Sequence, residues 1–105
     1  MKKVVYSVTR SGKVETKLTG IGFITDEDLV IACVSKNGKP YIRVFEDCIK
    51  NCRPIPDRKD EFRGPFYEIR EIEIETRNSS GEFTGYDRRE VELSYRIWYK
   101  LTENN

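Results

Sequence analysis

Two amino acids are missing from this 105-residue chain, which contains neither histidine nor glutamine. The absence of histidine excludes the Ser-His and Cys-His pairs that activate a nucleophile. It also excludes zinc sites that use imidazole ligands. Any catalysis would therefore depend on carboxylate, lysine, tyrosine or cysteine side chains.

The absence of glutamine coincides with a high content of charged residues, which make up 35% of the chain. Abundant charge with few thermolabile amides is typical of proteins from hyperthermophiles. The composition therefore favours a thermophilic source.

Long apolar segments are also lacking. The longest apolar run, residues 29–34, is far too short to cross a bilayer. The first eight residues are basic and then apolar, but Arg10 and Lys13 follow closely, so they resemble a strand more than a signal peptide. We therefore expect a cytoplasmic protein with no membrane partner.

The net charge of +1 is unevenly distributed. Residues 1–65 carry 13 basic and 9 acidic side chains, whereas residues 66–105 carry 6 basic and 9 acidic ones. The whole molecule therefore has no strong field that would attract a polyanion, although local patches can do so.

Most of the first half of the chain has the alternation of β-strands. Residues 4–9 and 14–18 alternate with a period of two around Ser11-Gly12, which predicts a hairpin. Gly20 and Gly22 then predict a bulge or a sharp bend.

A second hairpin is expected around Asn37-Gly38. The apolar run 29–34 predicts a central strand buried on both faces. Asn37-Gly38 suits a type I′ turn, and Pro40 begins the next strand, which continues to Phe45.

The strand pattern is interrupted between residues 47 and 65. Asp47 is expected to cap one helical turn across 48–52. The charged, proline-containing segment 53–65 is expected to form a long surface loop.

The remaining residues predict one long hairpin. Its strands are 66–77 and 86–99, with a turn at 78–81. The apolar residues of the first strand change from an odd position at Ile69 to even positions from Ile72 onward. A β-bulge near Arg70-Glu71 is therefore expected, because an extra residue would return them to one face.

These elements predict a single all-β domain over residues 1–105. The fold is expected to be a small, partly closed antiparallel barrel, SH3-like or OB-like, or a compact sandwich of six or seven strands. It would have a long C-terminal hairpin and at most one short helical turn near 47–52. The glycine pair and the long hairpin favour the barrel.

The three cysteines do not predict a metal site or any other cofactor. Cys48 and Cys52 form the one close pair, whereas structural zinc sites generally have two such pairs. Cys33 is expected to be a buried, small apolar residue. Whether Cys48 and Cys52 are reduced, bridged or metal-bound stays open at this point.

Basic and aromatic residues alternate on two of the predicted strands, and they suggest a leading function. Cations that contact phosphates and rings that stack on bases are what single-stranded nucleic acid requires. We therefore expect a non-enzymatic binding module that contacts nucleic acid through a sheet face and the 53–65 loop. The residues concerned are Tyr41, Arg43, Arg96, Trp98 and Lys100 on strands, with Arg53, Arg58, Lys59 and Arg63 in the loop.

An acidic stripe on the final hairpin supports two alternatives. Glu71, Glu73 and Glu75 alternate on one strand, and Glu90 and Glu92 alternate on the other. The stripe suits a protein-interaction adaptor or inhibitor, such as those of viruses and mobile elements, or a homodimer contact. The four residues Glu71, Glu73, Glu90 and Glu92 also suit a small carboxylate-dependent hydrolase or nuclease. No catalytic constellation is evident, so the binding module stays the leading hypothesis.

Overall fold

The computed structural model describes residues 1–12 and 16–102, and their strands form one antiparallel sheet of seven strands that is not closed. The strands are β1 (Lys2–Arg10), β2 (Thr16–Ile24), β3 (Leu29–Val34), β4 (Pro40–Phe45), β5 (Arg53–Pro54), β6 (Glu61–Arg77) and β7 (Phe83–Leu101). A short 3₁₀ helix, η1 (Ile49–Asn51), precedes β5. Within the described residues, no helix is long and apolar enough to span a membrane.

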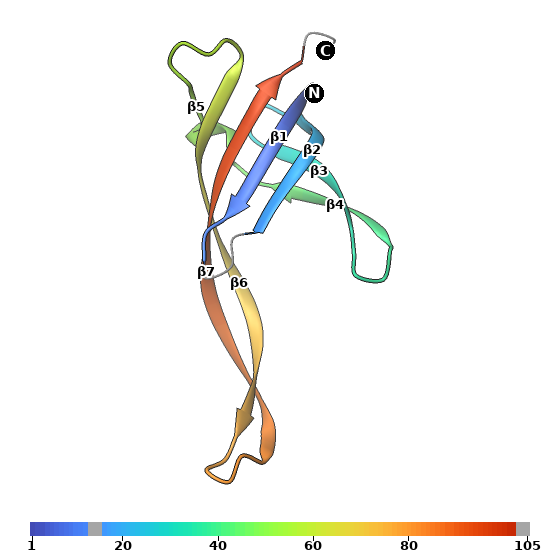
Figure 1. Cartoon of the computed structure of the whole chain (residues 1–105), viewed down its shortest axis with the longest axis vertical. Helices are drawn as coiled ribbons and strands as arrows, with labels where there is room; N and C mark the ends of the chain where they lie inside the picture. The colour runs from blue at the N-terminus through green and yellow to red at the C-terminus, as the bar shows by residue number, and fades with distance from the viewer. Residues whose placement is uncertain (13–15, 103–105) are drawn as a thin grey trace.

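The strand order is β4-β3-β2-β1-β7-β6-β5, so β1 lies at the centre of the sheet. The sheet coils so that β3 and β4 cross behind β1 and β2 (Figure 1). No backbone ladder joins β4 to β6, but their side chains meet: the ring centroids of Phe45 and Phe66 are 5.3 Å apart. The two ends of the sheet are therefore held together by side chains.

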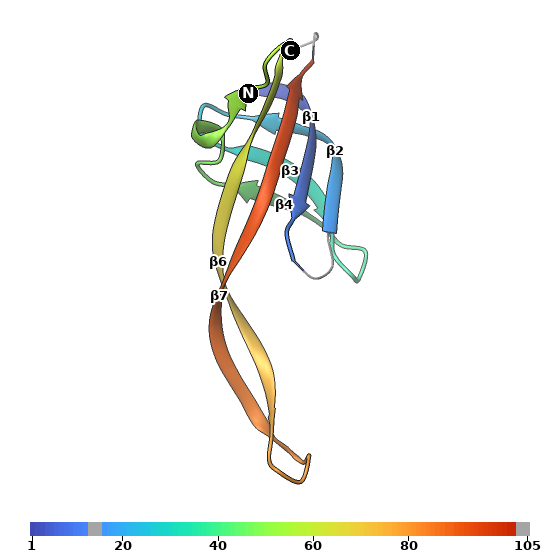
Figure 2. The ribbon, with the colours of Figure 1, turned by 60° about the vertical axis from the view of Figure 1, so that its left-hand side comes forward.

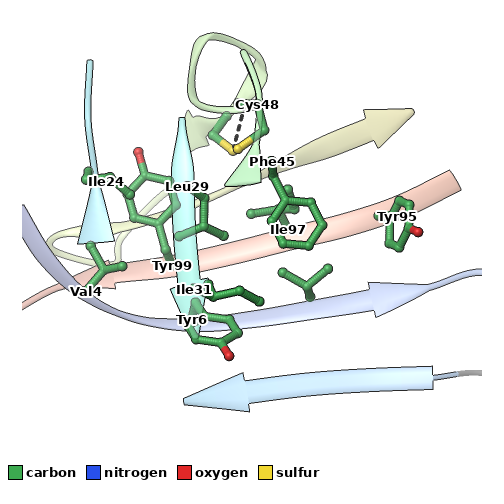
Figure 3. Packing of buried hydrophobic residues seen from close by; sticks show 12 residues of the cluster. Val4, Tyr6, Ile24, Leu29, Ile31, Phe45, Cys48, Tyr95, Ile97 and Tyr99 are labelled. Carbon is green, nitrogen blue, oxygen red and sulfur yellow. Dashed lines mark hydrogen bonds between the residues drawn. The ribbon is translucent and has the colours of Figure 1, made fainter. Parts of the chain in front are cut away.

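The core lies on the concave side of this coiled sheet, between β1 and β7 and the crossing strands β3 and β4 (Figure 3). Alternation along the strands explains its composition, because every second residue points inward. The buried apolar residues are Val4, Tyr6 and Val8 of β1, Ile24 of β2, Leu29 and Ile31 of β3, Phe45 of β4, Cys48, Cys52, and Tyr95, Ile97 and Tyr99 of β7.

The two glycines of β2 make room for an aromatic ring. Gly20 and Gly22 pair with Tyr6 and Val4 of β1 without any change of register, so of the expected bulge or sharp bend the bulge is absent. A Cβ atom on Gly22 would lie 2.9 Å from the Val30 carbonyl oxygen and 3.2 Å from the Tyr6 ring. The missing side chains thus let β3 and Tyr6 approach β2 closely.

Two expectations about the second hairpin are wrong. β3 is next to the edge strand, and its burial alternates: Leu29 and Ile31 are buried, whereas Ala32 and Val34 are exposed. The turn has one residue with positive φ, Gly38 at +78°, whereas a type I′ turn requires two. The hairpin itself is confirmed, with Val34 paired to Pro40.

The segment after β4 is more ordered than its composition suggests. The helical turn is confirmed as η1, but Asp47 does not cap it; Asp47 has φ of +58°, and its N–H donates to Asp28 Oδ1 at 2.8 Å. The predicted 53–65 loop is wrong, because β5 and the start of β6 occupy most of it and only 55–60 connect them. Gly64 packs tightly against the Asn51 backbone, and a Cβ there would lie 2.8 Å from the Asn51 carbonyl carbon.

The final hairpin is confirmed and is longer than predicted. β6 and β7 keep one register from the Glu61–Lys100 pair to the Thr76–Gly85 pair. The bulge expected near Arg70-Glu71 is wrong, since the register shifts only between Thr76 and Arg77. The apolar residues change from odd to even positions because Ile69 faces outward and is 69% exposed.

The lower half of this hairpin forms an arm that leaves the rest of the sheet (Figure 2). We call residues 69–92 the arm and the remainder of the described chain the head. The molecule measures 60 × 30 × 21 Å, with a Cα radius of gyration of 17.4 Å. A compact chain of this length would have a radius of gyration of about 13 Å, so the arm elongates the molecule considerably.

Candidate nucleic-acid interface

The two faces of β7 have opposite character, as the sequence alternation predicts. Tyr95, Ile97 and Tyr99 are buried in the core. Arg96 and Lys100 are exposed and Trp98 is half-buried on the outer, convex face. The strand therefore directs its cations and its one indole away from the core.

The pairing of β5, β6 and β7 adds two arginines to this face. Arg63 of β6 lies directly opposite Trp98, and Arg53 of β5 lies directly opposite Arg63. Residues directly opposite each other in antiparallel strands share a face. We define the basic outer face as Arg53, Arg63, Arg96, Trp98 and Lys100.

An open hollow of about 310 Å³ lies on this face, and three arginines line it: Arg53, Arg63 and Arg96. Its remaining lining is small or apolar, comprising Asn51, Gly64, Pro65 and Ile97. The close approach of Gly64 to Asn51 brings β5 and η1 beside β6. The hollow therefore offers clustered guanidinium groups to an anionic group beside the indole of Trp98.

A single carboxylate positions the indole. Trp98 Nε1 donates to Glu61 Oε1 at 3.1 Å, and Arg58 Nη1 lies 3.6 Å from the same oxygen. Glu61 is only 15% exposed, so it is covered by these partners. Arg58 and Lys59, which were expected to contact phosphates, lie in the 55–60 connection at the end of this face.

Sequence reasoning missed the continuation of this face onto β1 and β2. Lys3 and Val5 point outward from β1, opposite Phe23 and Ile21 of β2. Ile21 is 60% exposed, Phe23 43% and Val5 40%. Alternation in both strands was evident in the sequence, but the pairing of β1 with β7, which joins these residues to Trp98, was not.

Two predicted residues do not belong to this face. Tyr41 and Arg43 do share one face of β4, as predicted, but it is the concave side that also carries buried Phe45. Arg43 donates to Tyr95 Oη at 3.0 Å and to Glu68 at 3.3 Å. Its guanidinium also lies 4.5 Å from the centre of the Phe45 ring. Arg43 is thus a structural residue, and the structure does not bring it to Trp98.

The acidic stripe lies on the outer side of the arm. Glu71 is directly opposite Glu90, a like-charged pair that is destabilising by itself. Arg88 offsets it, with its guanidinium 3.4 Å from Glu71 and 3.5 Å from Glu73. Glu75 pairs with Arg77 at 3.2 Å. Arg89, on the other face of β7, pairs with Asp87 instead.

Two of the three cysteines, Cys48 and Cys52, belong to the core. Cys33, Cys48 and Cys52 form no disulfide with one another in this structure. Burial raises the pKa of Cys48 to about 12 and that of Cys52 to about 11. Neutral, buried thiols are poor metal ligands and poor nucleophiles. Cys33 is half-buried at the edge of the core, not fully buried as expected.

One acidic cluster was not foreseen. Carboxylate oxygens of Glu27, Asp28 and Asp47 lie within 4.8 Å of one another. Glu27 and Asp47 are exposed, and Asp28 already accepts the Asp47 N–H. Surface carboxylates of this kind are common without a bound ion, so the cluster carries no argument for function.

Comparison with protein-family models, with curated proteins and with solved structures finds no match for this chain. The function of this chain is therefore inferred from the geometry of the site alone.

Proposed function

We propose that this protein is a non-enzymatic module that binds single-stranded nucleic acid on the basic outer face. The observation that carries the proposal is the hollow lined by Arg53, Arg63 and Arg96 beside Trp98. Guanidinium groups contact phosphates, and an indole offers a surface on which a base stacks without regard to sequence.

The coiled sheet suits this role. We propose that it acts as a partly open barrel of the SH3-like or OB-like kind, whose convex face is the ligand surface. Such sheets hold single strands on rigid backbone with side chains from several strands. The arginines and Trp98 come from three neighbouring strands, which fixes their spacing.

A binding role fits the carboxylates better than hydrolysis does. The two glutamates nearest to a catalytic pair, Glu71 and Glu73, lie on an exposed ribbon and share Arg88 as a counterion. Both are more than half exposed, so they lack the dry, shaped cavity that a metal-dependent hydrolase supplies.

A second candidate function is protein recognition by the arm, including the adaptor or inhibitor role suggested by its acidic stripe. The observation that favours it is the exposed aromatic pair at the arm's end. Phe83 and Tyr86 are 51% and 63% exposed, with ring centroids 5.2 Å apart. Exposed aromatic residues on a protruding element are frequent anchors of protein interfaces.

The leading proposal is tested by Trp98 fluorescence during titration with a single-stranded oligonucleotide of about 16 nucleotides, the upper site size of one small barrel. We expect quenching at low salt, and affinity that falls about twentyfold between 50 and 200 mM salt if about three phosphates are neutralised. Trp98 is the only tryptophan, so the signal reports this face alone.

A matched pair of variants tests whether Arg63 contacts a phosphate group. Arg63→Gln should weaken binding and reduce the slope of log K against log salt by about 0.7, the value for one phosphate on a single strand. Lys36→Gln removes the same charge from the exposed β3–β4 turn and should leave the slope unchanged. Fluorescence that stays constant at both salt concentrations would refute the proposal.

A further inference from the structure

The outer side of the β6–β7 hairpin carries opposite net charge on the two sides of its middle. Tyr67 and Ser94 face each other at the centre, where Tyr67 is 62% exposed and neighbouring Ile69 is 69% exposed. Toward the head, the outer residues are the cations of the basic outer face. Toward the arm's end they are mostly glutamates.

The rows two and four residues from the centre correspond in opposite charge, and the rows six residues from it are neutral. Two residues from the centre, Arg96 on the head side corresponds to Glu92 on the arm side. Four residues from the centre, Arg63 corresponds to Glu71. Six residues from it, each row holds one cation and one carboxylate: Glu61 with Lys100, and Glu73 with Arg88. Rows are spaced about 7 Å apart, because each residue rises about 3.3 Å.

We propose that a second copy of this chain covers this surface, with two hairpins stacked face to face and antiparallel about a two-fold axis at Tyr67. Such an axis places Arg96 against Glu92 of the other copy and Arg63 against its Glu71, twice over. It also places the exposed Tyr67 and Ile69 at the centre, next to Pro65. An isologous contact with an apolar centre and complementary charges around it is the usual form of a homodimer interface.

Electrostatic repulsion disfavours two other ways of pairing the hairpins. Stacking the hairpins in parallel would bring each row over the same row of the other copy, so that rows of like net charge meet and Glu71 lies over Glu90, which is unfavourable. Edge-to-edge pairing through β6 is unfavourable too, because Glu71, Glu73 and Glu75 would approach their own counterparts. In the antiparallel stack, rows of opposite net charge meet two and four residues from the axis. The rows six residues from it are neutral, although Glu61 then lies over Glu73 and Lys100 over Arg88 of the other copy.

The contact is small. It extends over about 40 Å of a two-stranded ribbon, which places it among the weak and transient interfaces. We therefore expect micromolar association that is strong at low salt and lost at high salt. This inference does not depend on nucleic-acid binding, although both uses share Arg63 and Arg96, so a ligand and a second copy would compete.

The test is sedimentation of the full chain without nucleic acid, at low and high salt and at up to about 1 mM protein. The wild type should form a dimer at low salt and return to its 12.4 kDa monomer at high salt. Arg96→Glu and Glu92→Arg should each weaken self-association about tenfold or more, because like charges then meet across the axis.

The decisive sample is the equimolar mixture of Arg96→Glu with Glu92→Arg. Neither variant pairs with itself, but in the mixed dimer every altered contact again joins opposite charges, so a dimer should reappear. Lys36→Glu and Glu82→Arg change the same charges on exposed turns away from the surface and should pair like the wild type. A wild type that stays monomeric at low salt, or a mixture that does not associate, overturns the proposal.

The test of self-association can be distinguished from the test of nucleic-acid binding. Glu92→Arg should lose pairing but keep oligonucleotide binding, whereas Arg96→Glu should lose both. Pairing without any oligonucleotide signal would leave this inference standing and refute the proposed function.

Discussion

Arg43 joins the two ends of the sheet. Its guanidinium lies over the Phe45 ring of its own strand and bonds Glu68 of β6 and Tyr95 of β7. Its side chain is 21% exposed, so these bonds form in a partly dehydrated environment. The residue thereby substitutes for the backbone ladder that is absent between β4 and β6.

Arg43→Ala should therefore lower the free energy of unfolding by about 2 kcal/mol, less than the 3–5 kcal/mol for breaking a fully buried pair. Arg77→Ala removes an ion pair whose partners are more than half exposed and should cost less than about 0.5 kcal/mol. Urea denaturation measures both. Because Arg43 lies on the concave side, its removal should leave oligonucleotide affinity unchanged, and a loss of affinity in the folded variant would contradict its placement.

The buried thiols make stability depend on alkaline pH. Burial raises the pKa of Cys48 from its ordinary value of 9.0 to about 12 and that of Cys52 to about 11. The unfolded chain thus loses these protons at lower pH than the folded chain does. The stabilisation is complete below pH 9 and is lost progressively as pH rises toward 12.

Denaturation at pH 8, 9.5 and 11 should show that the free energy of unfolding falls over this range. At pH 8, thiol reagents should modify Cys48 and Cys52 only after the protein unfolds. Tyr99, whose pKa burial also raises to about 12, adds to the same decline. Cys48→Ala should reduce the loss of stability between pH 8 and 11. A stability that is constant between pH 9 and 11 would contradict this explanation.

At the scale of the element, the arm is the least supported part of the fold. The buried core residues all belong to the head. The arm depends on cross-strand contacts such as the Thr76–Thr84 hydrogen bond and the ion pairs of Arg88. An isolated two-stranded ribbon is marginally stable in water.

Amide hydrogen exchange at high salt, where copies should be separate, should therefore be much faster in the arm than in β1 and in the part of β7 that pairs with it. At low salt and high protein concentration, pairing should slow exchange in the arm. Equal protection of arm and head at high salt would show that the ribbon is stable without a partner.

Strands and turns that form through contacts between residues close in sequence were predictable. Strands that form through contacts between residues far apart in sequence were not. The hairpins at Gly38 and at Asn78–Gly81 follow from local turn chemistry and alternation. By contrast, Pro54 and the charged residues mask the strand pattern of β5 and of the first residues of β6, so the sequence predicts a loop there. What orders them is tertiary: Gly64 packs on Asn51, and Phe62 stacks on Tyr99 with centroids 5.0 Å apart.

For the whole molecule, the all-β class was predictable but the strand order was not. β1 pairs with β7 across almost the full length of the chain, and no local signal encodes that pairing. The same limit applies to the candidate site. Arg96, Trp98 and Lys100 could be grouped because they share a strand, whereas the side of the sheet on which Arg43 lies depends on how the sheet coils.

The separation of head and arm also makes the molecule an electric dipole. The arm carries four arginines and seven carboxylates, a net charge of −3, whereas the described residues of the head carry a net charge of +5. These opposite charges lie toward the two ends of a 60 Å axis, so the total of +1 conceals most of the field. A surface of either sign will therefore attract the protein, and the sign decides which end points outward.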